Sequence, residues 1–239
     1  PQKLEMHYQP MAALNGGPHF LEALCRIRHG KLLLTPDRFM PVVQTRRLEA
    51  EFDLAVIQRV LEAIESGRIP PSQGISINLF AQSLPRPEIV SHLIELTRHI
   101  DRHPLMLEIT ETSLIPQLED VSYFLEMLRG NGYQIALDDF GSGYSPLRYL
   151  ADLPVEAVKF DMALVRKLEN RDRAGIVVAD FAKLMIDAGY TLVAEGIENA
   201  ALLDRVRELG FSYAQGWHIG RPAALPDPQS DSIAQASSS

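Results

Sequence analysis

Residues 134–143 read Gln-Ile-Ala-Leu-Asp-Asp-Phe-Gly-Ser-Gly, an apolar run that leads into two adjacent carboxylates and a glycine-containing segment. A short apolar run of this kind is consistent with a buried strand. Because successive side chains of a strand point to opposite faces, Asp138 and Asp139 can share one site only if the strand ends there. The glycines that follow tolerate the backbone angles of a sharp turn. The segment therefore predicts a buried strand with a polar end.

The same pattern recurs along the chain. Eight short apolar or alternating runs predict strands, at about 4–14, 20–27, 75–78, 105–110, 134–138, 157–160, 191–195 and 213–217. Amphipathic segments between them predict helices over 49–66, 87–100, 116–129, 173–188 and 199–209. Strands that alternate with helices favour a mostly parallel sheet covered by helices.

Two α/β architectures fit this alternation. An open doubly wound sheet gathers its ligands at one switch point, whereas a barrel draws functional groups from the ends of many strands. Polar side chains lie at the ends of several predicted strands here, namely Asn78, Glu108, Asp138, Lys159 and Glu195. The sequence therefore favours a (β/α)8 barrel.

Composition excludes several classes of protein. The chain has 239 residues, 46% of them hydrophobic, which is enough for a large core. A net charge of −8 argues against broad binding to DNA or to an anionic membrane. The single cysteine, Cys25, excludes an internal disulfide and fits a reducing compartment, so we expect a cytoplasmic location. No apolar run has the length of a membrane span, and we expect a domain of a longer protein.

The gathered carboxylates predict a site for divalent metal. Two carboxylates held close without a cation repel each other, and one takes up a proton. Two Mg²⁺ or Mn²⁺ ions would remove that conflict, with one carboxylate able to bridge them. An Asp-Asp pair that caps a helix or forms an Asx turn is the alternative for residues 138 and 139. A kinase-like Asp-Phe-Gly is a weaker alternative, because no glycine-rich phosphate loop accompanies it.

Lysine and glutamate side chains near the strand ends each allow two interpretations. Lys159, in a strand that should be buried, either contacts an anion or extends to solvent. Glu111 and Glu198, each three residues after Glu108 and Glu195, either support the site or occupy the first turn of a helix. For Glu108 and Glu195 a purely structural role is unfavourable, because burying an unpaired acid is costly.

Several motifs together resemble one known family. They are Glu22-Ala-Leu24, Asn78, Glu108-Ile-Thr-Glu111, Asp138-Asp-Phe-Gly-Ser-Gly143, Lys159-Phe-Asp161, Glu195-Gly-Ile-Glu198 and Gln215-Gly-Trp-His-Ile-Gly-Arg-Pro222. In this order, from about Leu4 to Pro222, the chain resembles the EAL domain, the cyclic di-GMP phosphodiesterase module of bacteria. The resemblance implies a modified TIM-like barrel whose first strand is antiparallel to the rest. The chain differs from the family's common pattern at Cys25-Arg-Ile27, Ser142 and Trp217-His218. None of these residues is a proposed metal ligand.

The resemblance also implies a role for each matched residue. Glu22, Asn78, Glu108 and Asp138 would hold one metal, and Asp138, Asp139 and Glu195 the second. Lys159 and Gln215 would lie beside the attacking water, so the residues implied in catalysis are Asp138, Asp139, Lys159, Glu195 and Gln215. Substrate contacts are implied for Gln9, Glu22, Leu24, Arg26, Asp161 and Glu198. Glu111 and Glu198 would support the metal-binding loops.

The resemblance implies hydrolysis of cyclic di-GMP to linear 5′-pGpG, with two Mg²⁺ or Mn²⁺ ions per site and with Ca²⁺ inhibitory. The alternative is a receptor that binds cyclic di-GMP without cutting it. A homodimer and covalently linked sensory or GGDEF domains are further expectations, and a parent protein anchored in a membrane would hold this domain in the cytoplasm. We expect the domain to span residues 1–222. The tail, residues 223–239, is poor in large apolar residues and is expected to be flexible.

Overall fold

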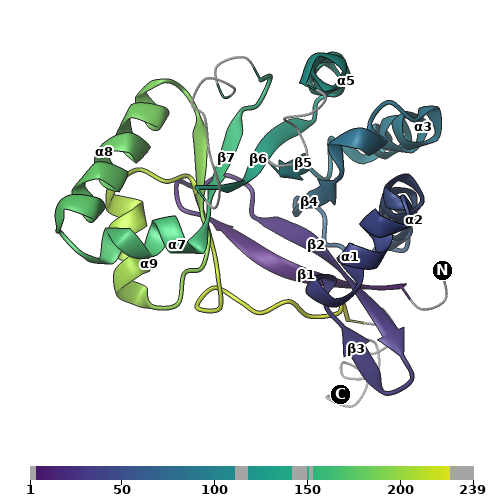
Figure 1. Cartoon of the computed structure of the whole chain (residues 1–239), viewed down its shortest axis with the longest axis horizontal. Helices are drawn as coiled ribbons and strands as arrows, with labels where there is room; N and C mark the ends of the chain where they lie inside the picture. Colours follow the sequence, from purple (N-terminus) through teal and green to yellow (C-terminus); the bar gives the residue numbers. More distant parts are fainter. Residues whose placement is uncertain (1–3, 111–117, 142–149, 151–152, 227–239) are drawn as a thin grey trace, which may run out of the picture.

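The computed structural model describes residues 4–110, 118–141, 150 and 153–226 (Figure 1). Its centre is a sheet of strands in the order β1-β9-β8-β7-β6-β5-β4-β2-β3, closed by a pairing of β1 with β2. The strands are β1 (Leu4–Ala13), β2 (Phe20–His29), β3 (Leu32–Leu34), β4 (Gly74–Leu79), β5 (Leu105–Thr110), β6 (Gln134–Phe140), β7 (Ala157–Phe160), β8 (Thr191–Ala194) and β9 (Tyr213–Gln215). All but β3 form a closed eight-stranded barrel, which confirms the predicted architecture.

The first strand runs against its two neighbours. β1 pairs antiparallel with β2, where Gln9 lies opposite Glu22, and also antiparallel with β9. From β2 through β4 to β9 the barrel pairs are parallel. The reversal expected for the first strand is therefore confirmed.

Helices surround the barrel, with α1, α2 and α3 on one side and α8 and α9 on the other (Figure 1). The helices and helical turns are α1 (Pro36–Thr45), α2 (Glu49–Glu65), η1 (Ala81–Ser83), α3 (Pro87–Leu96), η2 (Thr97–His99), α5 (Leu118–Gly130), α7 (Met162–Val165), η4 (Arg166–Glu169), α8 (Arg173–Asp187) and α9 (Ala200–Glu208). Every predicted helix is present within a few residues of its expected bounds. In the described part of the chain, no helix has both the length and the apolar character needed to cross a membrane.

The barrel interior contains an apolar layer that is separate from the core under the helices. This apolar layer consists of Met11, Phe20, Met106, Ala136, Ala157, Val193 and Tyr213. The intervening strand residues, such as Leu107 and Val158, belong instead to the larger cluster that packs against the helices. The alternation follows from the two-residue period of a strand, and it fills the barrel with side chains.

Some residues that follow the expected end of the domain at residue 222 contact the barrel. Ala223, the first residue assigned to the tail, pairs with Tyr8 of β1 through two backbone hydrogen bonds, of 2.7 and 3.1 Å. Leu225 packs against the main core. Ordered contacts therefore reach past residue 222. Because residues 227–239 lie outside the described part of the chain, the flexible tail remains a prediction.

Candidate metal centre

A polar layer lies directly above the apolar layer of the barrel interior. Each member is two residues from an apolar-layer residue on the same strand, so both point inward. The polar layer consists of Gln9, Glu22, Glu108, Asp138, Lys159, Glu195 and Gln215. On the parallel strands the polar residue follows its apolar partner, as Lys159 follows Ala157. On the antiparallel β1 it precedes it, because Gln9 comes before Met11. The reversed strand thus still places its polar side chain at the same end of the barrel.

Lys159 lies at the centre of the polar layer and is 1% exposed. Its Nζ lies 2.6 Å from Glu108, 2.8 Å from Glu195 and 3.2 Å from Asp138. A fourth carboxylate, that of Glu22, is 3.8 Å away. Such burial excludes a lysine that extends to solvent, and the alternative of an anion contact is correct. One ammonium group faces four carboxylates, so the centre has an excess of negative charge.

The excess charge shifts the pKa values of these groups. Burial raises the pKa of Glu195 to about 7, and Asp138 adds to that shift. Burial likewise raises the pKa of Glu108 well above its usual value, although Lys159 opposes the shift. Burial alone would lower the pKa of Lys159, but the surrounding carboxylates outweigh it and the pKa is raised. The lysine therefore stays charged, and part of the acid cluster takes up protons when no other cation is present.

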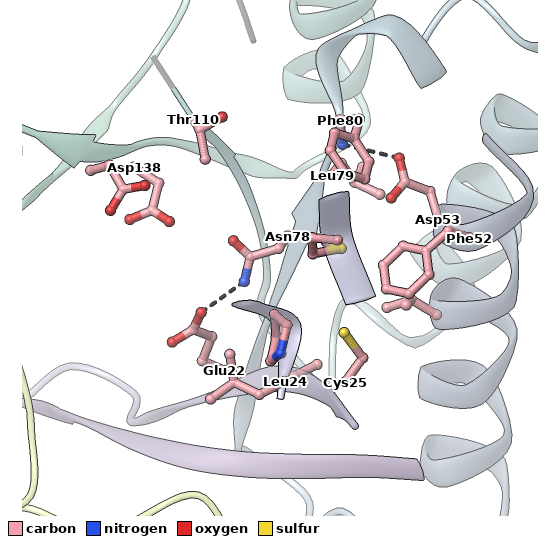
Figure 2. Close-up of a pocket in the computed structure, with 15 residues that line it drawn as sticks. Glu22, Leu24, Cys25, Phe52, Asp53, Asn78, Leu79, Phe80, Thr110 and Asp138 are labelled. Atoms are coloured by element: carbon pink, nitrogen blue, oxygen red, sulfur yellow. Dashed lines mark hydrogen bonds between the residues drawn. The ribbon is translucent and has the colours of Figure 1, made fainter. Parts of the chain in front are cut away.

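Glu22 differs from Glu108 and Glu195 in having a lowered pKa. Burial would raise its pKa, but Lys159 and donors from two amide side chains outweigh burial, and its pKa is lowered. Asn78 donates its Nδ2 to Glu22 Oε1 at 2.7 Å, and Gln215 donates its Nε2 to Glu22 Oε2. These bonds fix the carboxylate and leave the Asn78 oxygen turned toward the side of Asp138 (Figure 2).

The side chains of Asp138 and Asp139 lie at one site because of a local backbone geometry that the sequence does not predict. The strand does not end at Asp138, because β6 continues to Phe140 with a shift of register against β7 between Leu137 and Phe140. Within this irregularity Asp139 has a φ of 58°, in the left-handed region. The bulge breaks the alternation of side chains, so both carboxylates serve the same site. The expectation that the strand ends at Asp138 is therefore wrong, whereas the turn expected of the following glycines begins at Gly141, which has a φ of 99°.

Asp138, Asp139 and Glu195 offer oxygen atoms that lie within 4.8 Å of one another. Burial raises the pKa of Asp139, with Asp138 as the next cause. Within the described part of the chain, Gln215 Oε1 is buried and accepts no hydrogen bond, and Asp138 Oδ1 has only the ion pair with Lys159 Nζ at 3.2 Å. Hard divalent cations prefer carboxylate and amide oxygens of this kind. The donor set therefore fits Mg²⁺ or Mn²⁺.

Further polar residues support the layer. Ser76 donates its hydroxyl to Glu108, a contact that the sequence analysis did not identify. Ser76 could have been predicted, because it lies two residues before Asn78 on the same strand and its side chain therefore points to the same face. Gln9 accepts a hydrogen bond from Gln215 at 3.2 Å and donates one to the Gly220 carbonyl at 3.0 Å. It therefore links the first strand to the segment after the last.

A cavity of about 260 Å³ opens between the polar layer and α2 (Figure 2). Glu22, Asn78 and Asp138 line one wall, and Phe52 and Asp53 of α2 line the opposite wall. We call it the first cavity. Burial raises the pKa of Asp53 to about 8, against the opposing effect of a hydrogen bond from the Phe80 amide at 3.0 Å. This acid has no buried lysine to hold its charge, so its neutral form is favoured.

A second cavity of about 480 Å³ opens on the other side of the polar layer. Glu22 and Leu24 line both cavities, so the two meet at the polar layer. Glu198 lines the second cavity and pairs with Arg166 at 2.8 Å. Because α9 begins at Ala200 with Asn199 as its cap, Glu198 is not a first-turn helix acid. Arg166 is a cation at this rim that the sequence analysis did not identify.

Two other predicted residues stand apart from the polar layer, and a third lies outside the described part of the chain. Arg26 donates to the carbonyl of its neighbour Cys25 at 2.7 Å, and its contact with a phosphate stays a prediction. Asp161 caps α7 by accepting a hydrogen bond from the Ala163 amide at 2.7 Å. Its contact with substrate also stays a prediction. Glu111 lies outside the described residues.

The chain is similar to proteins whose function is named. Residues 1–222 match the family model of the EAL domain. The chain is 32% identical over 230 residues to the cyclic di-GMP phosphodiesterase PdeB of Shewanella oneidensis, covering 93% of the chain and 27% of PdeB. It is also 32% identical to the cyclic di-GMP phosphodiesterase RocR of Pseudomonas aeruginosa, covering 92% of the chain and 57% of RocR. The chain thus spans about a quarter to somewhat over half the length of these relatives.

Solved structures agree with this assignment. The PaMucR phosphodiesterase in complex with c-di-GMP is 30% identical with a TM-score of 0.79, and the match covers 93% of each chain. BlrP1 of Klebsiella pneumoniae, in a complex with calcium and cyclic di-GMP, is 26% identical with a TM-score of 0.78, over 95% of this chain and 57% of BlrP1. With its closed barrel, its reversed first strand and its layer of inward carboxylates, the chain belongs to the EAL domain family.

Proposed function

We propose that this domain hydrolyses cyclic di-GMP to linear 5′-pGpG in the presence of Mg²⁺ or Mn²⁺. The observation that carries the proposal is the polar layer, in which four carboxylates surround Lys159 and a fifth, Asp139, joins them through the bulge of β6. A cluster of this kind has too much negative charge for one lysine. Divalent cations would neutralise it, and the named activities of the relatives give the substrate class.

The polar layer, together with Asn78 and Asp139, would supply ligands for two metal ions. Glu22, Asn78, Glu108 and Asp138 would hold one, and Asp138, Asp139 and Glu195 the other. When bound, the ions would lower the pKa of a water molecule and neutralise charge on the phosphate oxygens. Asp138 contacts Lys159 and also lies beside Asp139 and Glu195, a position that supports Asp138 as a shared ligand. Asn78 adds an oxygen ligand without adding further negative charge.

The chain's own residues position the reactants. Lys159 remains protonated, so its Nζ can donate a hydrogen bond to the attacking water and cannot act as the base at neutral pH. The Gln215 Oε1 atom, which has no donor within the described residues, can accept a hydrogen bond from the same water. The water gives up a proton to solvent and its oxygen forms the new bond to phosphorus. The bond from phosphorus to the 3′ oxygen breaks, and that oxygen takes up a proton from solvent. One phosphodiester is opened, and the product carries a 5′ phosphate.

The direct test is to incubate the purified chain with cyclic di-GMP and Mg²⁺ or Mn²⁺ and to separate the nucleotides by chromatography. We expect linear 5′-pGpG. In the Asp138→Ala variant we expect turnover to fall by more than about 100-fold, beyond the effect of losing an outer partner of a metal ligand. Asp187→Ala, which changes an exposed acid of α8, is the matched control and should keep the activity. Tight binding without any linear product would favour the alternative, a receptor that does not hydrolyse its ligand.

Calcium should support binding better than hydrolysis. Ca²⁺ takes longer bonds and a looser geometry than Mg²⁺, so it would hold the phosphate but misplace the water. A calcium complex with cyclic di-GMP exists for BlrP1. We expect cyclic di-GMP to bind the Ca²⁺-loaded chain and to remain intact in the same chromatographic assay. Hydrolysis as fast with Ca²⁺ as with Mg²⁺ would contradict this expectation.

The domain is also proposed to act as part of a longer protein. The named relatives are longer than this chain, and one of them, MucR of Pseudomonas aeruginosa, is named a bifunctional diguanylate cyclase and phosphodiesterase. Attached sensory or GGDEF domains, a homodimer and a cytoplasmic location fit this arrangement and remain proposals.

A further inference from the structure

The β2–β3 hairpin and helix α1 concentrate positive charge at one edge of an acidic chain. Residues 26–47 contain six Arg or Lys residues and one acid, although the net charge of the chain is −8. Figure 1 shows β3 and α1 next to each other at the end of β2, and α1 contacts β2. The exposed side chains that we call the basic surface are Lys31, Leu32, Leu33, Val42, Arg46 and Arg47. We propose that the basic surface docks on an anionic lipid membrane.

The cations of the basic surface have no acidic partner within the described residues. Arg28, on the same hairpin, donates to Glu5 at 2.8 Å, and Arg38 of α1 lies 3.5 Å from Asp37. Both of these acids are therefore already paired. The cations that form no ion pair within the described residues are Lys31, Arg46 and Arg47. Their charge is available to attract an anionic surface, and each cation close to such a surface adds to the attraction.

Large apolar side chains lie among these cations. Leu32 is 64% exposed and Val42 is 58% exposed. Leu32 follows Lys31 at the hairpin turn and lies opposite His29 in the pairing of β3 with β2. Val42 lies four residues before Arg46, so the two share the outer face of α1. At a membrane interface, such apolar groups reach the acyl chains while the flanking cations stay at the phosphate groups.

The backbone at Arg47 indicates that its side chain serves a purpose other than packing. Arg47 follows the last turn of α1 and has a φ of 54°, in the left-handed region. Its amide donates to the Gln44 carbonyl at 3.1 Å, and the Leu48 amide donates to the Val43 carbonyl at 2.9 Å, which are the two hydrogen bonds of a Schellman motif. Glycine is favoured at this position, and an arginine is strained there. A cation that lowers stability at this position is explained if its charge serves binding.

A lipid membrane fits the basic surface better than an acidic protein does. The apolar side chains lie on a hairpin turn and on the outer face of a helix, with cations between them, whereas the core of a protein interface is depleted of charge. The remainder of the chain carries the excess of acids, so an anionic membrane attracts this face and repels the others. Pro36 and Met40 of α1 line the first cavity. Docking would therefore bring the wall of the first cavity close to the membrane.

The test is sedimentation of the chain with phosphatidylcholine vesicles that either contain or lack phosphatidylglycerol. We expect binding only to vesicles with phosphatidylglycerol, and weaker binding as salt is added. Each cation at the surface should contribute about fivefold, so Arg46→Gln/Arg47→Gln should bind about 30-fold more weakly. Arg171→Gln/Arg173→Gln removes two exposed cations outside the basic surface and is the matched control. Because it changes the net charge by the same amount, it should bind as the parent chain does.

A label at Leu32 tests whether the hairpin enters the membrane. Burial raises the pKa of the Cys25 thiol to about 12, so a polarity-sensitive dye should react selectively with the new thiol of Leu32→Cys. We expect its emission to shift to shorter wavelength when phosphatidylglycerol vesicles are added. The same dye on Leu184→Cys, at a side chain of α8 that is 61% exposed, should show no shift. Equal shifts at the two positions would contradict docking through the basic surface.

Arg47→Gly separates docking from a structural role of the arginine. Glycine relieves the strain of the left-handed backbone, so the melting temperature should rise or stay unchanged while vesicle binding weakens about fivefold. A lowered melting temperature with unchanged vesicle binding would show that Arg47 only stabilises the end of α1, where a cation interacts favourably with the helix dipole.

The remaining outcomes decide the proposal as a whole. No sedimentation with phosphatidylglycerol vesicles at low salt, or an equal loss of binding in Arg171→Gln/Arg173→Gln, would overturn it. Retention of the chain on immobilised polyglutamate without any vesicle binding would instead assign the surface to an acidic protein, and it would also overturn the proposal. Hydrolysis of dissolved cyclic di-GMP should be the same in Arg46→Gln/Arg47→Gln as in the parent chain. The proposed function is therefore tested independently of membrane docking.

Discussion

The two layers inside the barrel are separated by only two residues on each strand, about 6–7 Å along the strand, and yet they are opposite in character. The apolar layer, which includes Phe20, Met106 and Val193, is buried and apart from the Tyr213 hydroxyl has no polar side-chain atom. The polar layer contains four carboxylates around one ammonium group. On these strands, a side chain that packs in the apolar layer therefore lies only two residues from a side chain of the polar layer.

The difference shows how a barrel combines stability with a site. The apolar layer gains free energy by removing side chains from water, at about 25 cal/mol per Å² of apolar surface. The polar layer loses free energy on burial, because its charges give up hydration and only part of the loss is recovered through Lys159. The apolar layer stabilises the fold on which the polar layer depends. Added cations should change only the contribution of the polar layer to the free energy of unfolding.

Removing the one cation of the polar layer should have the largest effect on stability. Lys159→Met leaves Glu22, Glu108 and Glu195 without their shared partner, so we expect the metal-free free energy of unfolding to fall by about 3–5 kcal/mol. Urea unfolding in the presence of a chelator measures it. Mn²⁺ should restore part of the loss, because it offsets the same charges. Lys183→Met, on the exposed face of α8, is the matched control and should change little. An unaltered unfolding midpoint for Lys159→Met would contradict the claim that the polar layer depends on Lys159 to offset its buried charges.

A cavity in the apolar layer should cost slightly less and respond differently to metal. Met106 is fully buried, and Met106→Ala removes apolar contacts at the level below Glu108. We expect a loss of about 2–4 kcal/mol in the free energy of unfolding. In contrast to Lys159→Met, the size of this loss should be the same with and without Mn²⁺. A loss that Mn²⁺ largely abolished would show that the layers are not independent.

A buried acid outside both layers should give the smallest effect, and one that depends on pH. Asp53 has an ordinary pKa of 3.8 and a pKa of about 8 in the folded chain. A carboxyl whose folded pKa is raised contributes stability below its unfolded pKa and loses it as pH rises through the folded value. Between about pH 6.5 and 8 we expect the parent chain to lose roughly 1–2 kcal/mol more than Asp53→Asn. Parallel pH profiles of urea unfolding test it, and identical slopes would contradict it.

Much of the fold could be predicted because it depends on local patterns. The alternation of apolar runs with amphipathic segments located all eight barrel strands and the helices around them. The segment from β3 through α1 was not predicted. Helix α1 carries Pro36 at its start and Pro41 inside it, and an internal proline argues against a helix. The reversal of β1 came from the family resemblance, since nothing in the spacing indicates it.

The site was predicted as a set of residues and not as an arrangement. Residue type and strand position selected Glu22, Glu108, Asp138, Lys159 and Glu195. The convergence of four acids on Lys159 depends on barrel closure, which brings together residues far apart in sequence. The bulge at Asp139 depends on the register of β6 against β7, and no property of residues 138–140 alone fixes that register. Ser76 could have been found from its spacing to Asn78.

The most direct test of a metal centre at the polar layer is calorimetric titration of the metal-free chain with Mn²⁺, together with the melting temperature of the Mn²⁺-loaded chain. We expect the parent chain to bind two ions and to have a raised melting temperature when loaded. We expect weakened binding in Asp138→Ala, because Asp138 would be a ligand of both ions. A chain that binds no Mn²⁺, or that binds it equally well after Asp138→Ala, would contradict the claim that the polar layer is a metal centre.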